Sequence, residues 1–337
     1  MSESNALSGQ ESQLPVEPMD PQLRDVQPGG GVVIRLELFW GRWRRWYLRT
    51  FRRAYVARMQ SLRQGTHNAC PHEVLDPRDL KFYRNQGGYA WRPQDDPFAW
   101  RDRLPFARDG LAELLLFSLL FFGLTVVAGW LAVSGWLSGV LLGVAWTVTV
   151  GAAVLGGLVV WFFRNPRRVV PSQPGLVVSP ADGTIATVEQ IEHDEFVDGP
   201  AVLIGIFLSI FNVHVNRAPV AGRVIGLRYR PGKCLNALRP ESVRENEQLA
   251  IRIQGAQPTY RRVTVRQITG QIARRIVCGL KPGDVVGRGE QFGMIKLGSR
   301  TVLVIPQESA LEVRVHVGQK VRAGQTVLAE YCRPPET

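Results

Sequence analysis

Gln291-Phe-Gly-Met-Ile-Lys-Leu-Gly-Ser-Arg300 is the stretch that decides the fold assignment of this chain. Ser179-Pro-Ala-Asp-Gly183 precedes it, and Phe207-Leu-Ser-Ile-Phe-Asn-Val-His-Val-Asn-Arg-Ala-Pro219 lies between the two. Taken alone, a Gly-Ser pair is an ordinary turn, and Ala-Asp-Gly is a turn in which the aspartate caps its own backbone. The three motifs in this order are far more specific than any one of them.

Together the three motifs resemble those of the phosphatidylserine decarboxylase family, and they are closest to its short form, found in bacteria and archaea. The resemblance covers roughly Leu111 to Tyr331. Family members cut themselves at a Gly-Ser bond and convert the serine into a pyruvoyl group. The resemblance therefore implies cleavage between Gly298 and Ser299, a pyruvoyl cofactor derived from Ser299, and two product chains, 1–298 and 299–337. It further implies decarboxylation of phosphatidylserine to phosphatidylethanolamine and CO2.

This chemistry explains why a glycine precedes the serine. Gly298 has no Cβ, so its carbonyl carbon is open to attack by the Ser299 hydroxyl, and a base must take the hydroxyl proton as the amide becomes an ester. Elimination and hydrolysis then leave the pyruvoyl ketone and ammonia. A Schiff base between that ketone and the amine of the serine headgroup withdraws electrons as CO2 leaves, as pyridoxal phosphate does. No metal and no diffusible cofactor are expected.

Two side chains are expected to assist Ser299. The resemblance assigns the charge-relay aspartate to Asp182, and His214 is the expected general base because imidazole titrates near neutrality. Long-form members carry His-x-x-His where this chain reads His214-Val-Asn-Arg217, so the step that His214 serves, self-cleavage or decarboxylation, stays open. A guanidinium is a poor base but a good clamp for carboxylate or phosphate. Arg217 and the adjacent Asn216 are therefore expected to bind the substrate.

Residues 164–337 are expected to form the catalytic domain. After Val169 the chain consists of short β-type runs separated by Gly, Pro and Asn turns, which predicts an antiparallel, mostly β fold. The predicted strands are 176–179, 184–190, 201–210, 224–229, 249–253, 261–267, 275–277, 301–305 and 312–317. Gly283-Asp-Val-Val-Gly-Arg-Gly289 recurs as Gly318-Gln-Lys-Val-Arg-Ala-Gly324. Such turns resemble those of biotinyl and lipoyl carrier domains, so barrel-sandwich-hybrid-like hairpins are expected.

A transmembrane helical hairpin is expected over residues 111–163. From Leu114 to Phe163 the chain runs 50 residues without a charged side chain. One crossing takes about 20 residues, so we expect two spans, near 113–133 and 139–162. Arginines flank both ends, which places both ends in the cytoplasm; they are Arg101, Arg103, Arg108, Arg164, Arg167 and Arg168. We therefore expect a protein of the cell (inner) membrane with a cytoplasmic catalytic domain.

Residues 31–110 are expected to form a basic amphipathic extension. Residues 35–63 contain nine arginines and one acid, Glu37. Aromatic and apolar residues recur there at steps of three and four, which predicts an amphipathic helix; they are Trp40, Trp43, Tyr47, Phe51, Tyr55 and Leu62. Arginine with aromatics fits nucleic acid or an anionic membrane surface, and the adjacent hairpin favours the bilayer, with no nucleic acid. Residues 1–30, rich in Ser, Gln, Glu, Pro and Gly, are expected to be disordered.

Several properties remain open at this level. The four cysteines are far apart and lack CxxC spacing, which is typical of reduced thiols. Archaetidylserine presents the same serine and phosphate, so an archaetidylserine decarboxylase is an alternative. An inactive lipid-binding scaffold of the same fold is another. The sequence does not reveal the role of residues 64–106. It also leaves the oligomeric state open, and a homo-oligomer is one possibility.

Overall fold

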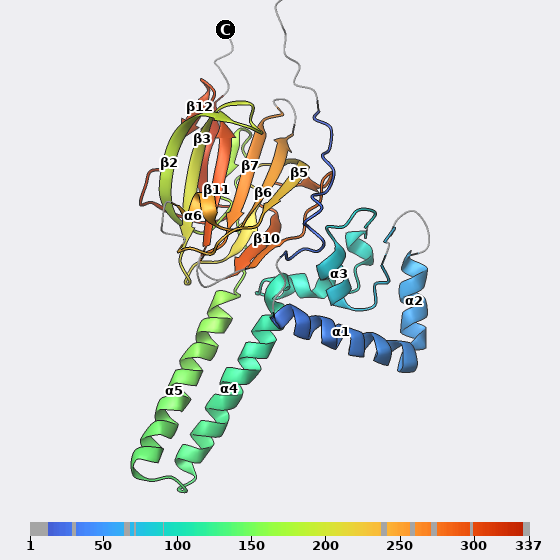
Figure 1. Ribbon diagram of the computed structural model, residues 1–337, viewed down its shortest axis with the longest axis vertical. Coiled ribbons are helices and arrows are strands. Elements are labelled where there is room, and N and C mark those ends of the chain that lie inside the picture. Colours follow the sequence, from blue (N-terminus) through green and yellow to red (C-terminus); the bar gives the residue numbers. More distant parts are fainter. Residues whose placement is uncertain are drawn as a thin grey trace, which may run out of the picture.

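The computed structural model describes residues 13–28, 32–63, 68–70, 72–89, 91–236, 241–256, 260–270, 275–296 and 299–332. The chain forms three parts: an N-terminal helical extension, a hairpin of two long helices, and a β domain. In Figure 1 the hairpin projects from one end of the β domain, and the extension lies beside their junction.

The two hairpin helices are α4 (Leu111–Val133) and α5 (Gly139–Phe162). Both are long and apolar enough to cross a membrane, and few of their residues are buried. Small residues let the two helices approach closely, since a Cβ on Gly156 would lie 2.9 Å from the ring of Phe122. The two helices match the spans expected near 113–133 and 139–162.

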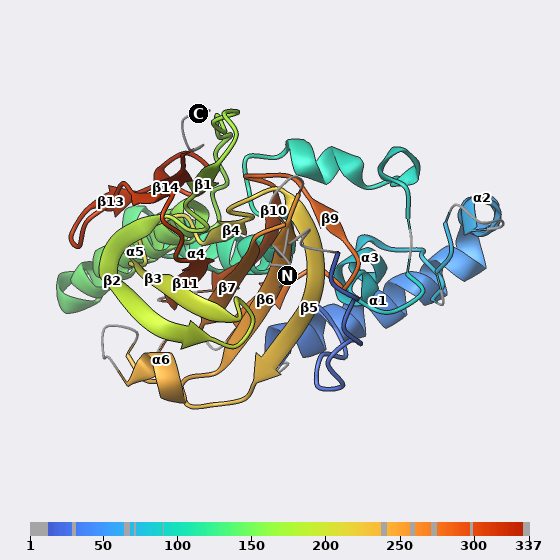
Figure 2. The same cartoon turned by 90° about the horizontal axis from the view of Figure 1, so that it is seen from above.

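The centre of the β domain is an antiparallel sheet of eight strands in the order β13-β2-β3-β11-β7-β6-β5-β9. Its strands are β2 (Gly183–Asp194), β3 (Gly199–Leu208), β5 (Gly222–Arg230), β6 (Gln248–Gly255), β7 (Arg262–Ile268), β9 (Val285–Val286), β11 (Ser299–Pro306) and β13 (Lys320–Val321). The sheet curls strongly (Figure 2), and its inward-facing Ile204, Ile251 and Leu303 are fully buried in the main core. The expected mostly β domain is therefore confirmed.

Two three-stranded sheets complete the domain, in the orders β4-β10-β8 and β1-β14-β12. Their strands are β1 (Leu176–Val178), β4 (Val215–Arg217), β8 (Arg275–Cys278), β10 (Gln291–Lys296), β12 (Leu311–Val313) and β14 (Val327–Tyr331), and a short helix, α6 (Ser242–Glu245), precedes β6.

The sequence did not predict β4, β9, β10, β13 or β14. In β10 the apolar run is interrupted by Gly293, where a Cβ would lie 2.0 Å from the carbonyl oxygen of Val277. A glycine required by close backbone approach thus hides a strand from pattern reading.

The extension contains α1 (Val32–Phe51), α2 (Arg53–Arg63) and α3 (Pro77–Tyr83), followed by three single turns at Pro93–Asp95, Ala99–Arg103 and Arg108–Gly110. The single helix expected over 35–63 is therefore broken at Arg52. Tyr47, Tyr55 and Leu62 were expected on its exposed aromatic face, but they pack against a small core around Met59. The break allows α2 to turn and cover this core.

Residues 13–28, which we call the N-terminal strap, pack along the β domain, whereas the whole of 1–30 was expected to be disordered. The amide of Glu17 donates to the carbonyl oxygen of Ile225 at 2.8 Å, and its carboxylate pairs with Arg252 at 2.8 Å. Gly226 leaves room for this carboxylate, since a Cβ there would lie 2.1 Å from Glu17 Oε2. Leu23 and Val26 of the strap are also buried, in two different hydrophobic clusters, so a few anchors hold a segment whose overall composition resembles that of a disordered one. The remaining residues of that range, 1–12 and 29–30, lie outside the described part of the chain.

Candidate active site

The three sequence motifs meet around the side chain of Asn216. Its Nδ2 donates to the carbonyl oxygen of Pro180 and to Oγ1 of Thr301, both at 3.2 Å. The Gln267 side chain donates to Asn216 Oδ1 at 2.9 Å. Asn216 is fully buried, so its amide is committed to protein partners. The structure therefore gives Asn216 a bridging position between the motifs; the expected substrate contact stays a prediction.

Ser299 is the first residue of β11 and pairs with Leu208 of β3. Its side chain is fully buried, and its Oγ has no hydrogen-bond partner among the residues described. Gly298 and Leu297, by contrast, lie outside the described residues. Buried hydroxyls normally have a partner. A buried serine hydroxyl left without one remains free to act as a nucleophile.

Asp182 lies in the loop between β1 and β2. Its Oδ1 accepts a hydrogen bond from the amide of Ala323 at 2.7 Å, and its Oδ2 accepts one from Arg168 at 2.8 Å. Asp182 immediately precedes β2 while Ser299 begins β11, and these two strands flank β3 at the same end of the sheet. Arg168 was expected at the membrane surface, but its side chain is only 7% exposed. Nothing in the sequence pattern indicated that Arg168 belongs to the site.

His214 lies beside the chain that leads into Gly298. Its carbonyl oxygen accepts a hydrogen bond from the amide of Ile295 at 3.1 Å. Its Nδ1 lies 2.9 Å from the carbonyl oxygen of Asn212, so Nδ1 carries the proton and Nε2 is left as an acceptor. Nε2 is buried and has no partner in the described part of the chain.

The imidazole of His214 is neutral at physiological pH. Burial lowers its pKa to about 4, assisted by the positive charge of Arg164 and opposed by the hydrogen bond to Asn212. The side chain is 1% exposed, and the ring of Phe162, the last residue of α5, lies 4.4 Å away. The open Nε2 can accept a proton, but the lowered pKa makes this imidazole a weaker base than a solvent-exposed histidine.

Arg217 extends from β4 into the same region as Asp182. Its guanidinium donates to the carbonyl oxygen of Gly289 at 2.9 Å and to Asn165 Oδ1 at 3.3 Å. Burial lowers its pKa, as does the positive charge of Arg168, while Asp182 opposes both. Arg168 pairs with Asp182, and Arg217 lies within electrostatic reach of both, so this region carries a net positive charge that could attract an anionic group.

The site lies at the end of the β domain that meets the hairpin. The loop before His214 presents the exposed side chains of Ile210 and Phe211. The carbonyl oxygen of Phe211 accepts hydrogen bonds from Trp161 Nε1 at 3.2 Å and from Arg164 at 2.8 Å. The loop is thus joined directly to the last turn of α5.

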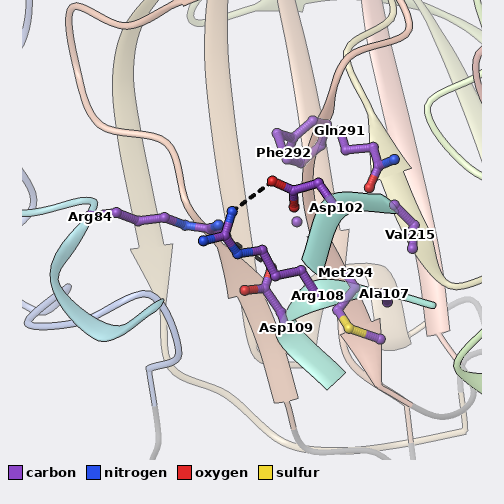
Figure 3. A pocket seen from close by; sticks show the side chains of 10 residues that line it. Arg84, Asp102, Ala107, Arg108, Asp109, Val215, Gln291, Phe292 and Met294 are labelled. Atoms are coloured by element: carbon purple, nitrogen blue, oxygen red, sulfur yellow. Dashed lines mark hydrogen bonds and ion pairs between the residues drawn. The ribbon is translucent and has the colours of Figure 1, made fainter. Parts of the chain in front are cut away.

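A separate cavity of about 130 Å³ lies where the extension meets β4 and β10, lined in part by Val215 and Met294 (Figure 3). Neighbouring residues of a strand point to opposite faces, so this cavity is on the other side of β4 from Asn216. Its arginines are already paired, Arg84 with Asp109 at 2.9 Å and Arg108 with Asp102 at 2.8 Å. The cavity therefore belongs to the contact between the extension and the β domain.

The described residues include no group of three or more His, Cys, Asp or Glu that could hold a metal ion.

Comparison with known proteins agrees with this geometry. A family model described as phosphatidylserine decarboxylase matches residues 155–329. The phosphatidylserine decarboxylase proenzyme of Rhodopirellula baltica is 54% identical over 252 residues, which cover 75% of this chain and 99% of that protein. The proenzyme of Carboxydothermus hydrogenoformans is 49% identical over 170 residues, which cover 50% of this chain and 78% of that protein. The proenzyme of Chlorobium phaeobacteroides is 40% identical over 224 residues, which cover 66% of this chain and 97% of that protein. The chain belongs to the phosphatidylserine decarboxylase family.

Proposed function

We propose that this chain is a self-processing, membrane-bound decarboxylase that converts phosphatidylserine to phosphatidylethanolamine and CO2. Family membership supports the reaction, and one structural observation supports the site. The unpartnered hydroxyl of Ser299 is buried two residues from Thr301, through which Asn216 joins all three motifs.

In the proposed cleavage, the Ser299 oxygen attacks the carbonyl carbon of Gly298, and the bond to the Ser299 nitrogen breaks to leave an ester. The hydroxyl proton passes to a base, for which the open Nε2 of His214 is suited. No hydrogen bond joins Ser299 Oγ to His214 Nε2 among the described residues. Transfer between them therefore requires a bridging water or a movement of one of the two side chains.

Asp182 is proposed to act by fixing charge and backbone. Its two carboxylate oxygens hold the Ala323 amide and Arg168, and within the described structure no hydrogen bond joins it to His214. Asp182 thereby holds Arg168 beside Arg217. We propose that these two guanidinium groups attract the carboxylate or phosphate of the substrate.

A pyruvoyl group at position 299 would supply the electron-withdrawing ketone on which decarboxylation depends. The chain suits such a group because the Ser299 side chain is enclosed and has no competing partner. Asn216 is proposed to position Thr301, and with it the start of β11, against the Asp182 loop.

The proposed membrane partner is supported by the outer face of α1. Its exposed apolar side chains are Val32, Leu36, Leu38, Phe39, Trp40, Trp43, Trp46 and Phe51. At 3.6 residues per turn all of these except Leu38 fall on one side of the helix, opposite the buried Ile34 and Leu48. In Figure 1, α1 runs across the hairpin axis, close to the end of the hairpin that meets the β domain. This is the arrangement of an interfacial helix lying on a bilayer that the hairpin enters, and we propose that the β domain faces the cytoplasm.

Cleavage is tested with full-length protein purified in detergent. The wild type is expected to yield chains of 298 and 39 residues, because 337 − 298 = 39, and the small chain should resist Edman sequencing because its first residue lacks an amine. Ser299→Ala should remain a single inactive chain, since it lacks the nucleophile, whereas the exposed-site control Ser309→Ala should cleave normally. Intact mass and release of CO2 from phosphatidylserine are the measurements. An active preparation made only of intact chains would contradict the proposal.

A further inference from the structure

Lys296 lies three positions before Ser299, at the end of β10, yet its side chain is only 8% exposed. Its ammonium forms an ion pair with Glu113, in the first turn of α4, and donates to Gln27 Oε1 of the N-terminal strap at 3.2 Å. Glu113 is equally buried, and it is the single acidic residue between Asp109 and Asp182. One buried contact therefore joins the hairpin, the strap and the chain next to the Gly-Ser bond.

A second buried ion pair lies within electrostatic reach of the first. Lys81 of α3 binds Glu37 of α1 at 2.8 Å, and both side chains are mostly buried. The positive charge of Lys81 lowers the pKa of Lys296, and the negative charge of Glu37 raises it. The junction thus holds two positive and two negative charges contributed by α1, α3, α4 and β10. Removing one member of a buried pair leaves an uncompensated charge, so these four elements are held in one arrangement.

The position of Lys296 bears directly on the Gly-Ser bond. β10 belongs to the three-stranded sheet and β11 to the eight-stranded sheet, so Leu297 and Gly298 connect two sheets. Only two residues separate Lys296 from Ser299, and consecutive Cα atoms are about 3.8 Å apart. One anchor of this short connection is the pairing of Ser299 with Leu208. The other is the end of β10, where the backbone of Lys296 pairs with Arg275 of β8 and its side chain forms the ion pair with Glu113.

We propose that Glu113 and Lys296 are positioning residues for self-cleavage, and that their ion pair presents the Gly298 carbonyl to Ser299 only when α4 is seated against the β domain. This inference rests on the proposed cleavage at Gly298-Ser299. A misplacement of about 1 Å between reacting groups costs about 100-fold in rate. Processing is thereby coupled to correct docking of the hairpin, and a chain with an unseated hairpin stays a precursor.

The test follows conversion of the full-length precursor during cell-free synthesis with lipid nanodiscs. Glu113→Gln and Lys296→Met should each slow cleavage at least about tenfold, because either change leaves a buried charge without its partner and so shifts the end of β10. The exchanged variant, Glu113→Lys with Lys296→Glu, should recover most of the rate, and so should Lys296→Arg, which keeps the charge. Arg266→Met is the control: it removes the ion pair of Arg266 with the buried Asp194, at the far end of β2, and should lower thermal stability without slowing cleavage.

Each outcome decides. Wild-type cleavage rates in both single variants overturn the proposal, and so does equal slowing by Arg266→Met, which would make the effect one of general stability. If the exchanged protein resists proteolysis as the folded wild type does but stays uncleaved, the ion pair is not what positions the bond. If the exchanged protein is unfolded, the Lys296→Arg variant is used in its place: a folded Lys296→Arg protein that stays uncleaved likewise overturns the proposal. A wild type that never cleaves would instead contradict the proposed function, because the positioning role concerns only differences from the wild-type rate.

Discussion

His214 has an imidazole whose pKa is lowered to about 4 by burial, from 6.5 in water. Between these two values the unfolded chain binds a proton that the folded chain does not bind. The free energy of unfolding therefore rises with pH across this window, and stability is lost as the pH falls from 6.5 towards 4. The shift corresponds to about 3 kcal/mol at most.

We expect this pH dependence to disappear on substitution of the histidine. In a Ser299→Ala background, which keeps the chain uncleaved, unfolding by denaturant in detergent is measured by tryptophan fluorescence at pH 7 and pH 4. His214→Gln should lose less stability on acidification than its parent, by up to about 3 kcal/mol. The exposed His193 is the control, and His193→Gln should behave as the parent does. Identical acid sensitivity of all three proteins would show that the imidazole titrates normally.

At single positions the sequence identified residue types better than their contacts. Ser299, Asp182, His214 and Arg217 lie at one end of the β domain, while their catalytic and binding roles stay predictions. The structure adds Arg168, whose distance from Asp182 in the chain concealed their ion pair. Such pairings depend on the fold, because burial and charge partners are set by segments far apart in sequence.

At the scale of elements, apolar β-type runs were informative for the long strands that are mostly buried. The predicted runs at 201–210, 224–229 and 301–305 are core strands β3, β5 and β11. The strands that were missed have two to six residues, and β9 and β13 follow the recurring glycine turns, at opposite edges of the large sheet. A two-residue strand has no period to detect, so only its partner reveals it.

Helix α1 carries the prediction that belongs to this scale. A fluorescent probe on Phe39→Cys, in a variant without the native cysteines, should report an apolar environment in nanodiscs containing anionic lipid, because this side chain is on the outer apolar face. A probe on the exposed Arg42→Cys, on the arginine-bearing flank, should report water. The measurement is the emission maximum with and without lipid. Equal emission from the two positions in lipid would mean that α1 does not lie on the bilayer.

At the scale of the whole molecule, proposed cleavage divides the chain without dividing the fold. The segment 299–337 includes β11, which hydrogen-bonds to β3 on one side and β7 on the other. It also supplies β14, which pairs with β1. Strands of the small chain are therefore interior to sheets of the large chain, and the two products stay together. Ser299 keeps the surroundings that the intact fold created.

The hairpin orients this assembly. Its 24-residue helix α5 is about 36 Å long at about 1.5 Å per residue, enough for a hydrocarbon core of about 30 Å. Trp130 and Trp136 contact each other near its tip, and Trp161 stacks under Arg164 at the other end. Tryptophan is enriched at the two interfaces of a membrane, so these residues mark where the bilayer would begin and end. The candidate active site then lies at the headgroup level of one leaflet.

Full-length protein is accordingly expected to remain in the membrane fraction through a carbonate or high-salt wash, since two spans are not removed by charge screening. Orientation is tested in intact cells with a membrane-impermeant thiol reagent on a variant without the native cysteines. Trp136→Cys, in the exposed connection between α4 and α5, should be labelled from outside, because both flanks of the hairpin are rich in arginine and should stay in the cytoplasm. Ser309→Cys, in the β domain, should be labelled only after the cells are opened. Release by carbonate would show that the helices do not span, and external labelling of Ser309→Cys would reverse the orientation and place the serine at the opposite leaflet.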